Sequence, residues 1–180
     1  MSIRDNLKMI LVTEDQIRKR SKELGEQITR DYEAEGKTPL LVALLSGSVP
    51  FLAELIKHID LDVMYDFMDV TSYEGTISTG NIKILKDLER SVVGKDILLV
   101  EDIVDTGRTV NAVAGMMRNK GAASVKLVTL LDKPQKRVCD VNADYTGFQI
   151  DDYFVVGFGL DYNQHYRCLP YVGVLKDDQY

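Results

Sequence analysis

The residues with the clearest chemical potential are two neighbouring acids, Glu101 and Asp102, which directly follow four apolar residues at positions 97–100. Four apolar residues are too few for a helix and predict a strand that is buried on both faces. Where such a strand ends, two carboxylates ~4 Å apart repel each other by roughly 4 kcal/mol in a protein-like dielectric. A metal ion, ligand hydroxyls or water must offset this repulsion.

A short turn, DTGRT at residues 105–109, follows the acids and leads into a helix-like run from Val110. Free N–H groups and the dipole at a helix start attract anions, and a glycine lets a phosphate approach the backbone closely. The acids and the turn together suit a sugar phosphate, which carries both hydroxyls and a phosphate. The residues alone leave two alternatives open: an ordinary strand-to-helix turn without a ligand, and a receiver domain that gathers acids around a metal.

Length, charge and apolar content exclude several classes of protein. A length of 180 residues predicts one domain over residues 1–180. The net charge of −6 argues against a nucleic-acid partner bound through a broad basic face. No apolar run approaches the ~20 residues of a membrane span, and no signal segment follows Met1, so we expect a cytoplasmic protein without a membrane partner. Cys139 and Cys168 lack a C-x-x-C spacing and are expected to be free thiols.

The elements that must position these residues alternate along the chain. A capping box at residues 13–16 predicts a helix to about Tyr32, and Pro50 predicts a second helix to about Lys57. Strands are predicted at residues 40–45, 61–70, 82–85, 97–100, 125–131 and 153–158, with an edge strand at 171–175 and an irregular polar segment at 71–80. This order predicts an α/β fold: a mostly parallel central sheet flanked by helices, with ligands at the carboxyl ends of its strands and a small hood from the terminal segments.

The stretch VEDIVDTGRTV at residues 100–110 resembles the phosphoribosyl-pyrophosphate signature of the type I phosphoribosyltransferases. The shared pattern is a hydrophobic strand, two acids and then D-T-G-x-T, and the chain lacks the G-x-x-x-x-G-K-[ST] phosphate loop. The resemblance implies that Glu101 and Asp102 contact the ribose hydroxyls and a Mg²⁺ ion. It also implies that the 5-phosphate is bound by Asp105, Thr106, Gly107, Arg108 and Thr109.

Two further loops are similar to those of the hypoxanthine–guanine branch of this family. Leu45, Ser46 and Gly47 correspond to its pyrophosphate loop, which carries a strained cis peptide, here expected between Leu45 and Ser46. Ser46 stands where many relatives have lysine, so only a backbone role is carried over. Ser72 and Tyr73 match the mobile lid, which protects an activated ribosyl group from water.

The C-terminal third carries the resemblance to the base site. Lys133, in the segment LLDKP, would donate to the exocyclic oxygen of a 6-oxopurine and thereby disfavour adenine. Phe154 would stack on the purine, worth roughly 1–3 kcal/mol, and the Val155 backbone would pair with the base edge. Asp161 would ligate a Mg²⁺ on the pyrophosphate, which Arg167 would also reach.

The implied reaction joins N9 of hypoxanthine or guanine to C1 of 5-phosphoribosyl pyrophosphate and expels pyrophosphate through an oxocarbenium-like state. Asp105 would lie near purine N7 as the general acid–base group. The family also implies a homodimer or homotetramer. Two alternatives stay open: a nucleotide-sensing regulator on the same fold, and an enzyme of this fold for adenine, orotate or uracil. The acidic charge disfavours the first, and Lys133 with residues 154–161 disfavours the second.

Overall fold

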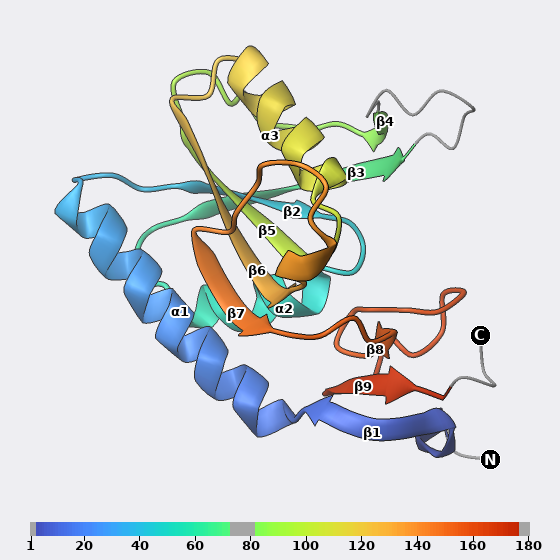
Figure 1. The fold of residues 1–180 in the computed structure, drawn as a ribbon. Coiled ribbons are helices and arrows are strands. Elements are labelled where there is room, and N and C mark those ends of the chain that lie inside the picture. Colours follow the sequence, from blue (N-terminus) through green and yellow to red (C-terminus); the bar gives the residue numbers. More distant parts are fainter. Residues whose placement is uncertain (1–2, 73–81, 177–180) are drawn as a thin grey trace.

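A central six-stranded sheet organises the computed structural model, which describes residues 3–72 and 82–176 (Figure 1). Its strands are β2 (Leu40–Leu44), β3 (Met64–Ser72), β4 (Ile82–Lys86), β5 (Asp96–Val104), β6 (Ser124–Asp132) and β7 (Tyr145–Gln149). They lie in the order β4-β3-β2-β5-β6-β7, and every pair is parallel except β3 with β4. The predicted mostly parallel α/β sheet is therefore confirmed.

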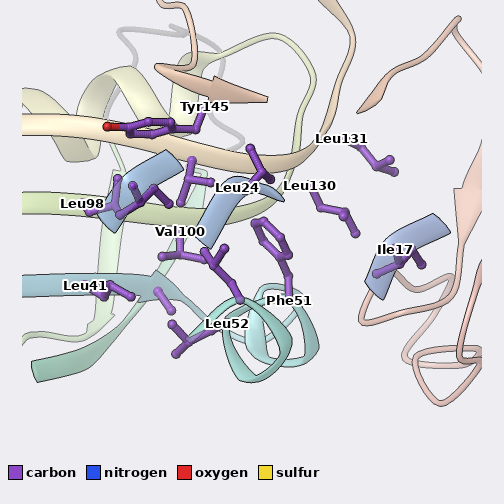
Figure 2. Close-up of a cluster of buried hydrophobic side chains, with 14 of the residues drawn as sticks. Ile17, Leu24, Leu41, Phe51, Leu52, Leu98, Val100, Leu130, Leu131 and Tyr145 are labelled. Atoms are coloured by element: carbon purple, nitrogen blue, oxygen red, sulfur yellow. The ribbon is translucent and has the colours of Figure 1, made fainter. Parts of the chain in front are cut away.

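Helices cover both faces of this sheet. Successive residues of β5 point to opposite faces and are apolar on both, so each face needs a covering layer. Leu98 and Val100 pack in one cluster with α1 (Glu14–Ala34) and α2 (Val49–Leu55), part of which Figure 2 shows. Ile97 and Leu99 pack on the opposite face with α3 (Arg108–Asn119). The predicted capping box begins α1. Short 3-10 helices occupy Ile3–Asn6, Ile56–His58 and Pro134–Lys136. None of the helices in the described segments combines the length and apolar character needed to cross a membrane.

The predicted hood is a small antiparallel sheet built from both ends of the chain. It contains β1 (Leu7–Val12), β9 (Val172–Leu175) and β8 (Val155–Val156), in that order (Figure 1). Three details of the sequence prediction were wrong. The segment 171–175 was expected at an edge but forms the middle strand, the strand at 153–158 shrinks to two residues, and β1 was not predicted.

β5 also differs from its prediction, because it does not end before the acids. Pairing with β2 stops at Val100, where β2 ends, whereas pairing with β6 continues as far as Val104. Residues 101–104 therefore remain in a strand that has a neighbour on one side only. Two other boundaries change as well: residues 71–72 belong to β3 rather than to an irregular segment, and β7 was missed.

Candidate active site

The two acids of β5 lie on opposite faces of the sheet, because neighbouring strand residues point in opposite directions. Glu101 lines a small cavity of about 100 Å³ together with the turn at 105–109. Asp102 lines a larger cavity of about 500 Å³ on the other side. The prediction that the strand ends before the acids is wrong, since pairing with β6 keeps the chain extended through them. The acids therefore serve two adjoining cavities.

Burial makes both acids resist ionisation. It raises the pKa of Glu101 well above its ordinary value of 4.5, and the nearby Asp102 carboxylate adds to this shift. Burial also raises the pKa of Asp102 to about 6 from 3.8, despite the N–H of Ile103, which donates to its Oδ1 at 2.7 Å, and despite the positive charge of Arg167. The negative charge of Asp161 acts in the same direction as burial. Two half-buried carboxylates with raised pKa values form a site that favours a cation or hydroxyl donors.

The turn after β5 forms one wall of the small cavity at the start of α3. Gly107 precedes the helix with φ +80°, a left-handed conformation that glycine adopts without strain. Thr106, Gly107 and Thr109 line the cavity, whereas the side chain of Arg108 is exposed and lies outside its lining. The turn thus offers hydroxyls and helix-start N–H groups to an anion, as its sequence predicted.

Asp105 belongs to the walls of both cavities. Its Oδ1 atom is buried and has no hydrogen-bond partner among the described residues, and its Oδ2 lies 3.9 Å from Nζ of Lys136. A buried carboxylate oxygen without a donor is costly and marks a position where a ligand can supply the missing hydrogen bond. Asp105 can therefore exchange a proton with a ligand that spans the two cavities.

Lys133 lines the larger cavity, and its side chain is only 7% exposed. Its Nζ donates to the carbonyl of Tyr153 at 2.7 Å and to Oδ1 of Asp152 at 3.3 Å. Phe154 also lines this cavity and packs edge-on against Tyr162, with 5.6 Å between the ring centroids. Val155 of β8 lines it as well. A buried cation and a half-exposed aromatic ring suit a flat heterocycle that carries an acceptor.

The loop after β2 contacts the acid of the larger cavity. The peptide between Leu45 and Ser46 is cis, as the family resemblance implied, and Ser46 is exposed. A Cβ atom added to Gly47 would lie 1.7 Å from Oδ2 of Asp102, so only glycine fits beside this carboxylate. Gly159 in turn packs on the carbonyl of Gly47. The loop therefore packs against Asp102, although none of residues 45–47 is part of the cavity lining.

Arg167 links the remaining predicted residues. Its guanidinium lies 3.0 Å from Oδ1 of Asp161 and donates to the Gly159 carbonyl at 2.6 Å. Asp161 lines the larger cavity. These contacts hold a cation and an acid at the edge of the cavity, next to the loop after β2. Of the two predicted lid residues, Ser72 is the last residue of β3, and Tyr73 lies outside the described residues.

Sequence reasoning missed two charged residues of the larger cavity, Lys136 and Asp152. Their side chains pair at 2.8 Å, and Asp152 also reaches Lys133. The pair raises the pKa of Lys136 and lowers that of Asp152. The spacing of Lys133 and Lys136, with Pro134 between them, was the available signal, because a short 3-10 turn brings residues three apart onto one side.

Comparisons with known proteins agree with this geometry. Residues 11–163 match the model of the phosphoribosyl transferase domain family. The chain is 51% identical over 179 residues to the hypoxanthine-guanine phosphoribosyltransferase of Streptococcus mutans serotype c, covering 99% of this chain and 98% of that protein. It is 54% identical over 175 residues to the enzyme of the same name from Lactococcus lactis subsp. lactis, covering 97% and 94%.

Solved structures extend the match to three dimensions. A crystal structure of a hypoxanthine phosphoribosyltransferase from Staphylococcus aureus superposes with a TM-score of 0.94 at 47% identity, covering 99% of this chain and 96% of that chain. The agreement in sequence spans the central sheet and the hood alike, because it covers nearly the full length of each relative. The chain belongs to the phosphoribosyltransferase family, in its hypoxanthine-guanine branch.

Proposed function

We propose that this enzyme transfers the 5-phosphoribosyl group of phosphoribosyl pyrophosphate to N9 of hypoxanthine or guanine, giving IMP or GMP and pyrophosphate. One observation carries the proposal: a small cavity at a helix start adjoins a larger cavity with a buried lysine and an exposed ring, and Asp105 lines both. The first suits the sugar phosphate and the second suits the base. The names of the relatives support this assignment.

In the larger cavity, Lys133 donates to the exocyclic oxygen of the purine and Phe154 stacks on its ring. The buried ammonium already has two acceptors, so it is oriented before the base arrives. Adenine presents an amino group at this position and would leave the ammonium facing another donor, which is costly in a buried site. The Val155 backbone meets the edge of the base. These contacts favour 6-oxopurines.

In the small cavity, the 5-phosphate is held by Asp105, Thr106, Gly107, Arg108 and Thr109, of which Arg108 contributes its backbone. Asp105 faces purine N7 and acts as the general acid–base group, with its unpartnered Oδ1 available for the proton. The pyrophosphate is held by the backbone of Leu45, Ser46 and Gly47 and by the guanidinium of Arg167. Ser72 and Tyr73 belong to the segment that excludes water.

The donor set fits Mg²⁺ as the metal of the reaction. Glu101, Asp102 and Asp161 offer hard carboxylate oxygens. Burial disfavours the ionised form of the first two, and a bound cation would stabilise that form. Among the described residues no three His, Cys, Asp or Glu side chains gather closely enough to hold a metal alone. Mg²⁺ commonly keeps waters and substrate oxygens as ligands, so such an open site suits it. When bound, the ion orients the ribose and pyrophosphate oxygens and neutralises charge on the leaving group.

A steady-state comparison of hypoxanthine, guanine, xanthine and adenine, each with phosphoribosyl pyrophosphate and Mg²⁺, tests the proposal. We expect release of pyrophosphate with the first two bases and at least a hundredfold lower kcat/KM with adenine. Equal rates with adenine, or no nucleotide product with any base, would contradict it.

The family also leads us to propose a homodimer or homotetramer. Met64 and Tyr65 at the start of β3 are 46% and 50% exposed, and exposed apolar side chains of this size are suited to an interface between copies. Light scattering coupled to gel filtration measures the mass directly. A monomer at micromolar concentration would exclude this part of the proposal.

A further inference from the structure

The segment 137–141, which has no role in the site described above, forms the floor beneath the phosphate-binding turn. The N–H of Val138 donates to the carbonyl of Thr106 at 3.0 Å, and the Cys139 thiol contacts the same oxygen at 3.4 Å. A Cβ atom added to Gly107 would lie 2.4 Å from Cγ1 of Val141 and 2.9 Å from Cδ of Arg137. The turn is therefore packed directly on this segment.

Within the segment 137–141, Arg137 makes the most hydrogen bonds to the chain around the turn. Its Nη1 donates to the carbonyls of Val104, at 3.0 Å, and Asp105, and its Nε donates to the carbonyl of Val141 at 3.1 Å. Its Nη2 pairs with the carboxylate of Asp132, and the two side chains are only 12% and 8% exposed. One buried guanidinium thus joins the end of β6, the end of β5 and the floor segment.

These contacts determine which way the turn presents its backbone. The carbonyl of one residue and the N–H of the next point in opposite directions across a trans peptide. The carbonyls of Val104, Asp105 and Thr106 all face the floor segment. The N–H groups of the following residues, 105 to 107, are therefore turned away from it, on the side where Thr106 and Gly107 line the small cavity. Successive N–H groups aimed at one point form an anion-binding concavity.

We propose that Arg137 is a positioning residue for phosphoribosyl binding, because it anchors the carbonyls of Val104 and Asp105, where the turn begins, and so aims the N–H groups that follow at the 5-phosphate. This inference rests on the proposed function, since it assumes that the small cavity binds that phosphate. Lysine cannot replace Arg137, because a single ammonium cannot reach the carbonyls of Val104, Asp105 and Val141 and a carboxylate with the fixed geometry of a guanidinium. Arg137 itself lines neither cavity.

The test compares the binding of IMP with that of inosine, which differs only in lacking the 5′-phosphate. The ratio of their dissociation constants, measured by calorimetry, reports the contribution of the phosphate alone. We expect a large ratio for the wild type, which supports the proposed function, and a ratio at least tenfold smaller for Arg137→Lys. Asp132→Asn keeps Arg137 but removes its charged partner, so its ratio should fall in the same direction.

Arg20→Lys is the matched control. Arg20 also donates to two backbone carbonyls, those of Gly147 and Thr146, and pairs with a carboxylate, that of Glu23, but these contacts join α1 to β7 away from the cavities. For the Arg20→Lys variant, the ratio of the inosine and IMP dissociation constants should stay within twofold of the wild-type ratio, even where the melting temperature of the variant falls. A wild-type ratio near one would refute the proposed function. A large wild-type ratio that both Asp132→Asn and any folded Arg137→Lys protein retain would overturn the inference about Arg137.

Discussion

Replacing Asp102 with asparagine should raise the free energy of unfolding of the ligand-free enzyme and lower its catalytic activity. The substitution removes the buried charge and keeps nearly the same shape, and the asparagine Oδ1 can still accept the N–H of Ile103. Burial raises the pKa of Asp102 from 3.8 to about 6. One pKa step corresponds to roughly 1.4 kcal/mol, so the ionised carboxylate lowers the stability of the folded protein by about 3 kcal/mol.

The pH dependence follows from the direction of this shift. Because the folded pKa lies above the unfolded one, the charge has no effect on folding below about pH 3, where both states are protonated. The cost in stability grows as the pH rises from the unfolded pKa of 3.8 to the folded pKa of about 6 and is complete above it. We therefore expect Asp102→Asn to be more stable than the wild type by up to about 3 kcal/mol at pH 7.5 and indistinguishable from it at about pH 3.

Urea unfolding followed by circular dichroism, in excess EDTA and without substrates, measures this difference. Asp66→Asn is the matched control, because the carboxylate of Asp66 in β3 is buried but accepts the N–H groups of Phe67, Glu89 and Arg90. An asparagine there loses an acceptor, so this variant should be less stable by about 1–3 kcal/mol. Loss of stability in Asp102→Asn at pH 7.5, or a gain that does not depend on pH, would refute the reasoning.

Three further predictions concern catalysis. Asp105→Asn should lower kcat at least tenfold and leave the dissociation constant of phosphoribosyl pyrophosphate close to normal, as single-turnover and binding measurements can show; weakened binding with normal turnover would contradict the acid–base role. Lys133→Gln should raise KM for hypoxanthine at least tenfold more than KM for phosphoribosyl pyrophosphate in steady-state assays, and equal losses would count against a role in base selection. Activity should disappear in excess EDTA and return with added MgCl₂, so full activity in the chelator would exclude the metal assignment.

The central sheet was predictable because its strands are buried on both faces. β2 is a continuous apolar run, and β5 and β6 each contain a mostly apolar stretch, ILLV at residues 97–100 and LVTLL at residues 127–131, as is typical of a buried strand. β7 lacked this signal, since its sequence YTGFQ is short, half-exposed and interrupted by Gly147, which packs on the Leu130 carbonyl. β1 depends on pairing with β9, a contact between distant parts of the chain that no local pattern encodes.

The candidate site was predictable where side-chain chemistry follows local sequence, as in the turn at 105–109. It was not predictable where neighbouring elements decide the geometry. Continued pairing with β6 keeps Glu101 and Asp102 in the strand and so sends them into different cavities. Arg137 gave no signal at all, because most of its partners are backbone carbonyls, whose positions depend on the fold rather than on residue type.

The pairing of β1 with β9 has a consequence for the order in which the molecule is assembled. Val155, in the wall of the larger cavity, is paired to Val174 of β9, and β9 is paired to β1 across almost the entire chain. Contacts so distant in sequence form slowly, because a long stretch of chain must first be brought together. During synthesis, β2 to β7 leave the ribosome before β9 does. A nascent chain can therefore have a folded central sheet and still be unable to bind a purine, because the part of the cavity that depends on β9 is not yet formed.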